Sequence, residues 1–357
     1  MNTSFNHYTV LKNETISNII PSETLLENLK KNAINSINII DATLGGGGHA
    51  ETLVKTLVSD SKYNSFEFNL ILFDQDINAI EFAKKRLNIF TKTHNNIKFY
   101  YENTNFSQVY EILNCKFPSQ KIHALYADFG VSSPQLDNGE RGFSLIHEGP
   151  LDMRMNPHAN ITAREILEDY SEEMLTKILF DFGEEPKARK LAKAIVLDRK
   201  KGLLPLNNTV LFADYVKRVL AYPNSRMHPA TRTFQALRIE VNQELEAINT
   251  LLQDIPKFIH PFGKAGFISF HSLEDRLVKH AMRNWQKGKN ANEKHNNSKD
   301  LQLPLHMQLH IEENHQRGFG KETPRGGITA SEAECKENNR SRSARFRCFE
   351  FSNVIED

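Results

Sequence analysis

The chain has 357 residues, 39% of them hydrophobic and 25% charged, which is ordinary for a globular protein of about two domains. It has no apolar run long enough to span a membrane, and its first residues lack the basic start and apolar block of a secretory signal. The formal net charge of +1 does not by itself indicate a nucleic-acid partner, and three cysteines without a C-x-x-C pair favour a reducing cytoplasm over a disulfide framework or a zinc site.

Short apolar runs are typical of buried strands and recur along the chain. In order, they cover residues 37–41, 68–74, 97–103, 123–130, 266–272, 306–311 and 345–351. Helical patterns separate the early runs, as in 76–87, where Ile80, Ala83 and Leu87 fall on one side. Such alternation predicts a parallel sheet with right-handed crossovers, covered on both faces.

This rhythm stops after residue 135, and no convincing strand follows until about residue 235. Thr162 and Glu165 have the spacing of a capping box, and apolar residues recur at helical spacing in 174–182 and 188–196. One further helix is expected where a single stripe contains Phe234, Leu237, Val241, Leu245, Ile248 and Leu252. The pattern predicts an α/β sheet domain interrupted by an all-helical insertion, and the polar residues 286–300 predict a surface loop.

Four glycines, 45–48, lie between the first predicted strand and a helix, the place where an α/β sheet binds its cofactor. Gly45, Gly47 and Ala50 loosely match a dinucleotide fingerprint. The second strand ends at Asp74, whose carboxylate suits the two hydroxyls of a ribose. Alternatively, Asp74 or Asp76 caps the next helix.

Two cofactor classes fit this loop. A pyrophosphate gains from a helix N-terminus, whereas S-adenosyl-L-methionine has no phosphate and needs only a tight loop with polar groups nearby. His49 directly after the glycines is unusual for a pyrophosphate site, although a lone histidine there is also compatible with no ligand role.

The end of the fourth predicted strand favours the second class. It reads DFGVSSPQLD from Asp128 to Asp137. Amino-group methyltransferases keep active residues at this strand end, and Asp128 is suited to accept a hydrogen bond from an exocyclic amine. An ordinary β-turn at Ser132-Ser133-Pro134 is the alternative interpretation.

The chain resembles the bacterial small-subunit (16S) rRNA cytosine-N4 methyltransferases of the MraW type over residues 7–350. The most specific matching segments are DFGVSSPQLD, GPLDMRM, HPATRTFQALRI and SFHSLEDR, together with DATLGGGGHAETLV and FDQDINAI. Ala42, Ala50 and Asn103-Thr104 depart from residues common in the family, and 286–327 matches poorly. None of these departures falls on a residue carried over as a cofactor contact.

The resemblance implies a class I Rossmann-like methyltransferase fold, with a seven-stranded, mostly parallel sheet and a helical insertion. It implies methylation of N4 of one cytosine in the decoding region of 16S rRNA, using S-adenosyl-L-methionine. On this basis we expect the cofactor-binding part to cover 1–136 and 236–357, and the insertion 137–235 to recognise rRNA. By the same resemblance the cofactor contacts are Gly47, Gly48, His49, Asp74, Phe106, Asp128 and Gln135.

Asp128 is also our candidate for the catalytic residue that accepts a hydrogen bond from the cytosine amine, and no metal is expected. Two basic clusters are candidates for phosphate contacts: Lys187, Arg189, Lys190 and Lys193, and Arg340, Arg342, Arg345 and Arg347. Arg141 and Arg154 are expected to flank the cleft, with Arg232 and Arg238 as further candidates. SFHSLEDR either contacts substrate or begins a helix with Ser272 as its N-cap.

Three other classes remain open from the residues alone. A nicotinamide-dependent oxidoreductase explains the glycines and Asp74, but not DFGVSSPQLD. A non-catalytic RNA-binding assembly factor would keep the fold, and an amino methyltransferase acting on DNA differs only in its substrate. The sequence leaves the oligomeric state open between monomer and homodimer.

Overall fold

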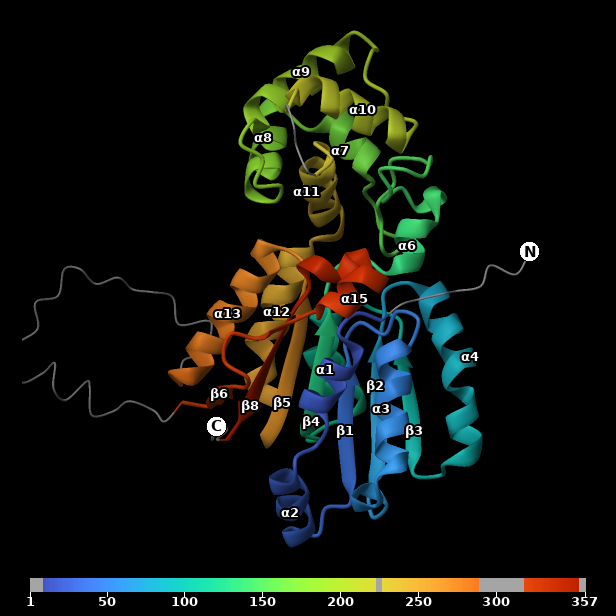
Figure 1. Ribbon diagram of the computed structural model, residues 1–357, viewed down its shortest axis with the longest axis vertical. Helices are drawn as coiled ribbons and strands as arrows, with labels where there is room; N and C mark the ends of the chain where they lie inside the picture. The colour runs from blue at the N-terminus through green and yellow to red at the C-terminus, as the bar shows by residue number, and fades with distance from the viewer. Residues whose placement is uncertain (1–8, 223–226, 289–317, 353–357) are drawn as a thin grey trace, which may run out of the picture. The chain divides into compact units, whose positions relative to one another are not determined.

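The computed structural model describes residues 9–222, 227–288 and 318–352, which divide into two compact units. The sheet unit consists of residues 9–129 and 247–352, and the helical unit of residues 130–246. Figure 1 shows the helical unit in green to yellow. The insertion expected at 137–235 lies within the helical unit. The strand expected at 306–311 and most of the polar stretch 286–300 lie outside the described residues.

The sheet unit is built on one sheet in the order β3-β2-β1-β4-β5-β8-β6, with β7 paired to β8 off this path. Its strands are β1 (Ser36–Asp41), β2 (Glu67–Phe73), β3 (Ile97–Glu102), β4 (Ile122–Asp128), β5 (Ile259–Ser269), β6 (Gly320–Glu322), β7 (Ile328–Thr329) and β8 (Arg345–Phe351). The pairs among β1 to β5 are parallel, and β8 runs antiparallel to β5. This confirms the predicted α/β class with a mostly parallel sheet. The expected number of seven strands is wrong, because the described residues form eight, the short β7 pairing with β8 beside the main path.

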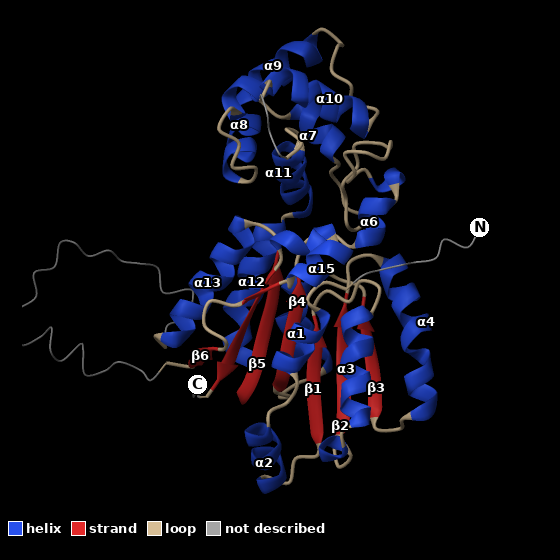
Figure 2. Ribbon diagram, viewed as in Figure 1, coloured by secondary structure: helices blue, strands red, loops and turns tan. Residues whose placement is uncertain are grey.

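Helices cover both faces of the sheet (Figures 1 and 2). One face packs on α1 (Lys12–Ile19), α2 (Glu23–Lys31), α3 (Gly48–Ser59) and α4 (Ile77–Thr93). The other packs on α5 (Val109–Lys116), α12 (Glu244–Phe258) and α13 (Ser272–Gln286). Successive residues of a strand point to opposite faces of the sheet. Ile39 therefore packs in the core beneath α1 to α4, and Ile40 packs in the core beneath α5, α12 and α13. The five parallel strands therefore end together at one edge.

The helical unit contains no strand among its described residues (Figure 2). Its helices are α6 (Ser133–Asp137), α7 (Ala163–Asp169), α8 (Glu172–Asp181), α9 (Ala188–Lys200), α10 (Thr209–Leu220) and α11 (Thr231–Asn242). They surround a separate apolar cluster that includes Leu179, Leu191 and Phe212. The predicted capping box is confirmed, since Thr162 and Glu165 satisfy each other's backbone N–H at the start of α7. Within the described residues, no helix is both long and apolar enough to cross a membrane.

The single helix expected from Phe234 to Leu252 is wrong. Two helices occupy this stretch, because α11 ends at Asn242 and Gln243 takes a left-handed conformation with φ of 50° before α12. Phe234 packs in the core of the helical unit, whereas Leu252 packs in the core of the sheet unit. The apolar residues of α11 and α12 both recur at helical spacing, and no glycine or proline lies at the break between the two helices. The sequence pattern therefore looks like one continuous helix.

Candidate functional site

Most of the predicted site residues lie at the carboxyl edge of the sheet, in the loops that follow its parallel strands. The glycine loop follows β1, Asp74 follows β2, Phe106 follows β3 and Asp128 is the last residue of β4. In an open α/β sheet this edge is where ligands bind.

The glycine loop is held by residues of its own unit. Gly45 takes a left-handed φ of 51°, and its N–H donates to Asp74 Oδ2 at 2.7 Å. The guanidinium of Arg86 on α4 donates to the Gly46 carbonyl at 2.7 Å. Gly47 has φ of 75° and is the N-cap of α3. The loop therefore has a defined shape before any ligand is considered.

The two glycines that precede His49 face other parts of the chain at very short range. A Cβ on Gly47 would lie 3.1 Å from the Ala83 Cβ, and a Cβ on Gly48 would lie 1.9 Å from the Thr9 Oγ1. The family resemblance implies cofactor contacts at both glycines. At both positions the structure supplies an intramolecular reason for glycine, because α4 and the turn at residues 9–11 occupy that space.

His49 is buried rather than presented on the surface, with an exposed fraction of 6%. Its Nε2 lies 3.1 Å from the Val10 carbonyl oxygen, and its ring meets the edge of Tyr126 at a centroid distance of 5.9 Å. A ring nitrogen facing a carbonyl must carry the proton, which defines the tautomer. The histidine thus connects the turn at residues 9–11 to β4.

Asp74 organises the ends of β1 and β2. Its Oδ2 accepts from Gly45 N–H, and its Oδ1 accepts from Asp76 N–H at 2.8 Å. Asp76 is the residue that caps α4, through a hydrogen bond from Asn78 N–H at 3.1 Å. Of the two alternatives for these aspartates, the helix cap applies to Asp76. Asp74 lies at the end of β2, the position for which a ribose contact was predicted.

Phe106 begins a short 3-10 helix, η2 (Phe106–Gln108), just past β3. Its ring is half-buried and lies 5.7 Å from the ring of Phe129, the residue after Asp128. An aromatic face is thereby placed next to the end of β4.

Acidic side chains gather at the ends of β1 and β4, and one of them was missed as a site residue. Asp41 is 1% exposed, and burial raises its pKa to about 7. Burial, with the nearby charges of Asp41 and Glu274, raises the pKa of Asp128 well above its usual range. Oδ1 of Asp128 is buried and has no hydrogen-bond partner within the described residues. Asp41 could have been identified from the sequence, because it is the acidic residue that ends the first buried strand.

The segment SFHSLEDR begins a helix, but its N-cap is His271, not the expected Ser272. Glu274 is fully buried, and its Oε2 accepts from Phe270 N–H at 2.7 Å. Asp275 pairs through both oxygens with Arg347 of β8, at 2.7 and 3.1 Å. The expected strand at 266–272 ends earlier, at Ser269. Glu274 and Asp275 thus have structural partners within the sheet unit.

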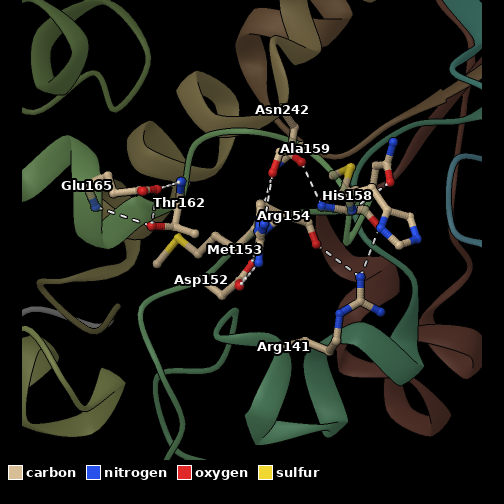
Figure 3. A network of polar contacts seen from close by, with 11 residues as sticks. Arg141, Asp152, Met153, Arg154, His158, Ala159, Thr162, Glu165 and Asn242 are labelled. Carbon is tan, nitrogen blue, oxygen red and sulfur yellow. Dashed lines mark hydrogen bonds and ion pairs between the residues drawn. The ribbon is translucent and has the colours of Figure 1, made fainter.

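Two arginines expected to flank the cleft form a network inside the helical unit, shown in Figure 3. Arg141 donates to the carbonyls of Arg154 and Met155 at 3.0 and 2.9 Å. Arg154 contacts both carboxylate oxygens of Asp152, at 2.9 and 2.7 Å, and donates to the Ala159 carbonyl. These contacts engage both guanidinium groups in holding the loop before α7.

Arg238 is similarly engaged, pairing through two nitrogens with Glu244 at 2.8 and 2.9 Å. Arg347 is 3% exposed and pairs with Asp275 and Glu322, so it is not available to phosphates. Gln135 belongs to the helical unit, where its Oε1 accepts from Ser132 N–H at 3.0 Å at the start of α6.

A basic surface does exist on α9. Its apolar residues Ala188, Leu191, Ala192 and Ile195 are buried, which turns Arg189, Lys190 and Lys193 outward. These three cations are exposed and have no acidic partner among the described residues. We call them the α9 basic face. Cations that no protein carboxylate neutralises are suited to phosphate groups.

Comparison with known proteins gives consistent matches along nearly the whole chain. The MraW methylase family matches residues 4–352. The ribosomal RNA small subunit methyltransferase H of Clostridioides difficile (strain 630) is 37% identical over 349 residues, 97% of this chain and 99% of that protein. The methyltransferase H of Prochlorococcus marinus (strain MIT 9211) is 42% identical over 282 residues, 78% and 82% of the two chains. That of Ruthia magnifica is 37% identical over 344 residues, covering 96% and 98%.

Proposed function

The chain belongs to the MraW methylase family, and from this premise we propose its reaction and the residues that perform it. The protein is an S-adenosyl-L-methionine-dependent methyltransferase of small-subunit ribosomal RNA. It methylates N4 of a cytosine in the decoding region of 16S rRNA. We place this activity in the cytoplasm, which suits three cysteines that are all free thiols.

The residues at the carboxyl edge of the sheet suit this cofactor. The glycine loop, His49 and Asp74 would hold its amino-acid and ribose parts, and Phe106 would pack beside the adenine. Gln135 is proposed as a further contact. When bound, S-adenosyl-L-methionine supplies an electrophilic methyl group on a positively charged sulfur. Burial favours the uncharged forms of Asp41 and Asp128, and the positive charge of the bound sulfur would favour their ionised forms.

The observation that carries the assignment is Oδ1 of Asp128, a buried carboxyl oxygen with no hydrogen-bond partner in the described part of the chain. Buried polar atoms normally have partners, so an unsatisfied one at a strand end is a candidate ligand contact. A cytosine N4 amine supplies the N–H donor that this oxygen lacks.

Asp128 has two tasks in this mechanism. By accepting a hydrogen bond from the amine, it concentrates the nitrogen lone pair, which the cytosine ring otherwise delocalises. As the new nitrogen–carbon bond forms, the bond between that carbon and the cofactor's sulfur would break, and the cofactor would leave as an uncharged thioether. The amine loses one proton, which the ionised carboxylate of Asp128 would receive, since its raised pKa makes that carboxylate a stronger base. The target base must leave its stack to reach a buried carboxyl.

We assign the surrounding RNA to the α9 basic face. Phosphate contacts give affinity without reading sequence, and three unpaired cations on one helix face suit that task. Arg232, which is half-buried on α11, is a further candidate.

Mass spectrometry of small-subunit rRNA tests the reaction. Cells without this protein should lack N4-methylcytidine in 16S rRNA, and the wild-type gene should restore it, whereas Asp128→Asn should not. Asp169→Asn, a change at an exposed carboxylate on α7, is the control and should restore the modification. Unchanged N4-methylcytidine in cells that lack the protein would contradict the proposed function.

Binding measurements separate the rival classes. S-adenosyl-L-methionine should bind and NAD should not, and rRNA rather than a DNA duplex should be methylated. Replacing Arg189, Lys190 and Lys193 by alanine should reduce the slope of log affinity against log salt by about 2 to 3. Alanine at the exposed Lys12, Lys31 and Lys85 removes the same charge and should leave the slope unchanged.

A further inference from the structure

One peptide group of the turn at residues 9–11 is held from both ends. The Val10 carbonyl faces His49 Nε2 at 3.1 Å, and the Leu11 N–H donates to Glu334 Oε1 at 2.8 Å. These two groups belong to the same peptide plane. A side chain 323 positions away in sequence therefore fixes the orientation of the carbonyl that contacts His49.

Glu334 is itself held in place. It lies in the short helix α15 (Glu332–Glu337), which Ser331 caps by accepting from Glu334 N–H at 3.2 Å. Its Oε1 also accepts from the hydroxyl of the buried Ser341, at 3.0 Å. Figure 1 shows α15, in red, near α1. The carboxylate is therefore presented in one orientation toward Leu11.

The turn needs such support because its backbone is unfavourable by itself. Leu11 is a non-glycine residue in the left-handed region, with φ of 48° and ψ of 35°, and it immediately precedes α1. Thr9 of the same turn fills the space beside Gly48. A shift of the turn would therefore disturb both His49 and the glycine before it.

We propose that Glu334 is a positioning residue for cofactor binding, acting through the Val10–Leu11 peptide on His49. This inference rests on the proposed function, since it takes His49 as a cofactor contact. A carboxylate at the N–H end polarises the peptide, which makes the Val10 carbonyl a stronger acceptor and favours the tautomer of His49 that carries its proton on Nε2. The C-terminal part of the chain thereby contributes to a site built from the N-terminal strands.

The test compares Glu334→Ala, Glu334→Gln and the control Glu332→Ala, an exposed position on the same helix. Suppose that Glu334→Ala lowers the fraction of molecules with the binding-competent turn to a tenth of its wild-type value. The Kd for S-adenosyl-L-methionine then rises about tenfold. The KM for the cofactor should rise with it, while kcat changes by less than about twofold. Glu334→Gln keeps an acceptor oxygen and should give a smaller increase, and Glu332→Ala should match the wild type.

Nitrogen-15 NMR of His49 gives a second measurement that needs no cofactor. The wild type should show the Nε2–H tautomer, and Glu334→Ala should show a mixture. If Glu334→Ala does not fold, Ser341→Ala offers a milder change, with the same direction expected in both measurements. An unchanged Kd together with an unchanged tautomer in the folded variant overturns the inference. If the wild type fails to bind S-adenosyl-L-methionine, the proposed cofactor is wrong, and the tautomer still decides the role of Glu334.

Discussion

The hydroxyl of Tyr126 on β4 donates a hydrogen bond of 2.8 Å to Oδ2 of Asp41 at the end of β1. Both side chains are almost fully buried, and burial raises the pKa of each. Oδ1 of Asp41 accepts from Thr43 N–H at 3.1 Å, so the pair also shapes the entry to the glycine loop. The contact joins two neighbouring strands where the proposed cofactor site begins.

Tyr126→Phe should destabilise the protein by about 1 to 3 kcal/mol, because it leaves a buried carboxyl group without its side-chain donor. Urea unfolding can be followed by the fluorescence of Trp285, the only tryptophan in the chain, which is fully buried in the sheet unit. Tyr110→Phe is the matched control, since its ring stacks on Phe258 and its hydroxyl has no partner in the described residues. Equal losses in the two variants would contradict this role for the pair.

Stability should depend on pH through Asp41. Its pKa is about 7 in the folded protein against a usual value of 3.8, so the folded state holds a proton that the unfolded state has released between these values. The contribution of the group is therefore greatest below about pH 4 and is lost as the pH rises through about 7, a total of about 4 kcal/mol.

Asp41→Asn isolates this contribution, because the amide does not titrate. The unfolding free energy of the wild type minus that of Asp41→Asn should fall as the pH is raised from about 4 to about 8. Urea titrations of both proteins across this range measure the difference. A difference that stays constant, or that grows with pH, would show that Asp41 does not hold its proton in the folded state.

Gly48→Ala should destabilise the protein by about 1 to 3 kcal/mol, since the new methyl group would lie 1.9 Å from the Thr9 hydroxyl. Adding Thr9→Ala removes that oxygen and should recover part of the loss. Gly47→Ala is the control, because its cost arises from a φ of 75° and from Ala83, so Thr9→Ala should not relieve it. A double-mutant cycle by urea unfolding gives the coupling, which should be absent for Gly47.

Arg154→Lys should weaken the helical unit while leaving its affinity for RNA and the salt dependence unchanged. Lysine keeps the charge but cannot reproduce the contacts of Arg154 with both oxygens of Asp152 and with the Ala159 carbonyl. The expected loss is about 1 to 2 kcal/mol. Thermal unfolding and RNA titration measure the two effects. Weaker RNA binding without a loss of stability would contradict this prediction and would indicate that Arg154 contacts the RNA.

The strands were the most predictable part of the fold. The expected strand at 345–351 coincides with β8, and β1 to β4 differ from the expected runs by one or two residues at their ends. Buried strands of a parallel sheet are nearly continuous apolar runs, so local composition identifies them. The break at Gln243 was missed because a polar residue adopted a left-handed conformation that local signals assign to glycine or asparagine.

The candidate site was predictable to the extent that it depends on strand ends. Asp74 and Phe106 follow β2 and β3, and Asp128 is the last residue of β4, as the pattern indicated. The roles of the arginines were not predictable. The carboxylate of Asp152 is only two residues from Arg154, but the loop conformation decides that they pair, and only the folded chain brings Asp275 to Arg347. The capping residue of α13 was also displaced by one position, because His271 has the extended backbone of an N-cap and Ser272 is already the first helical residue.

The sequence by itself determined the fold class, the family and the chemistry of the strand ends, because these follow from local hydrophobic periodicity and from contiguous motifs. Only the tertiary structure decided which charges are buried and which are paired. The pKa of Asp41 depends on desolvation, and the contact of Glu334 with the Val10–Leu11 peptide joins residues 323 positions apart. Burial and long-range contacts are properties of the packed chain, and no pattern within a short segment contains them.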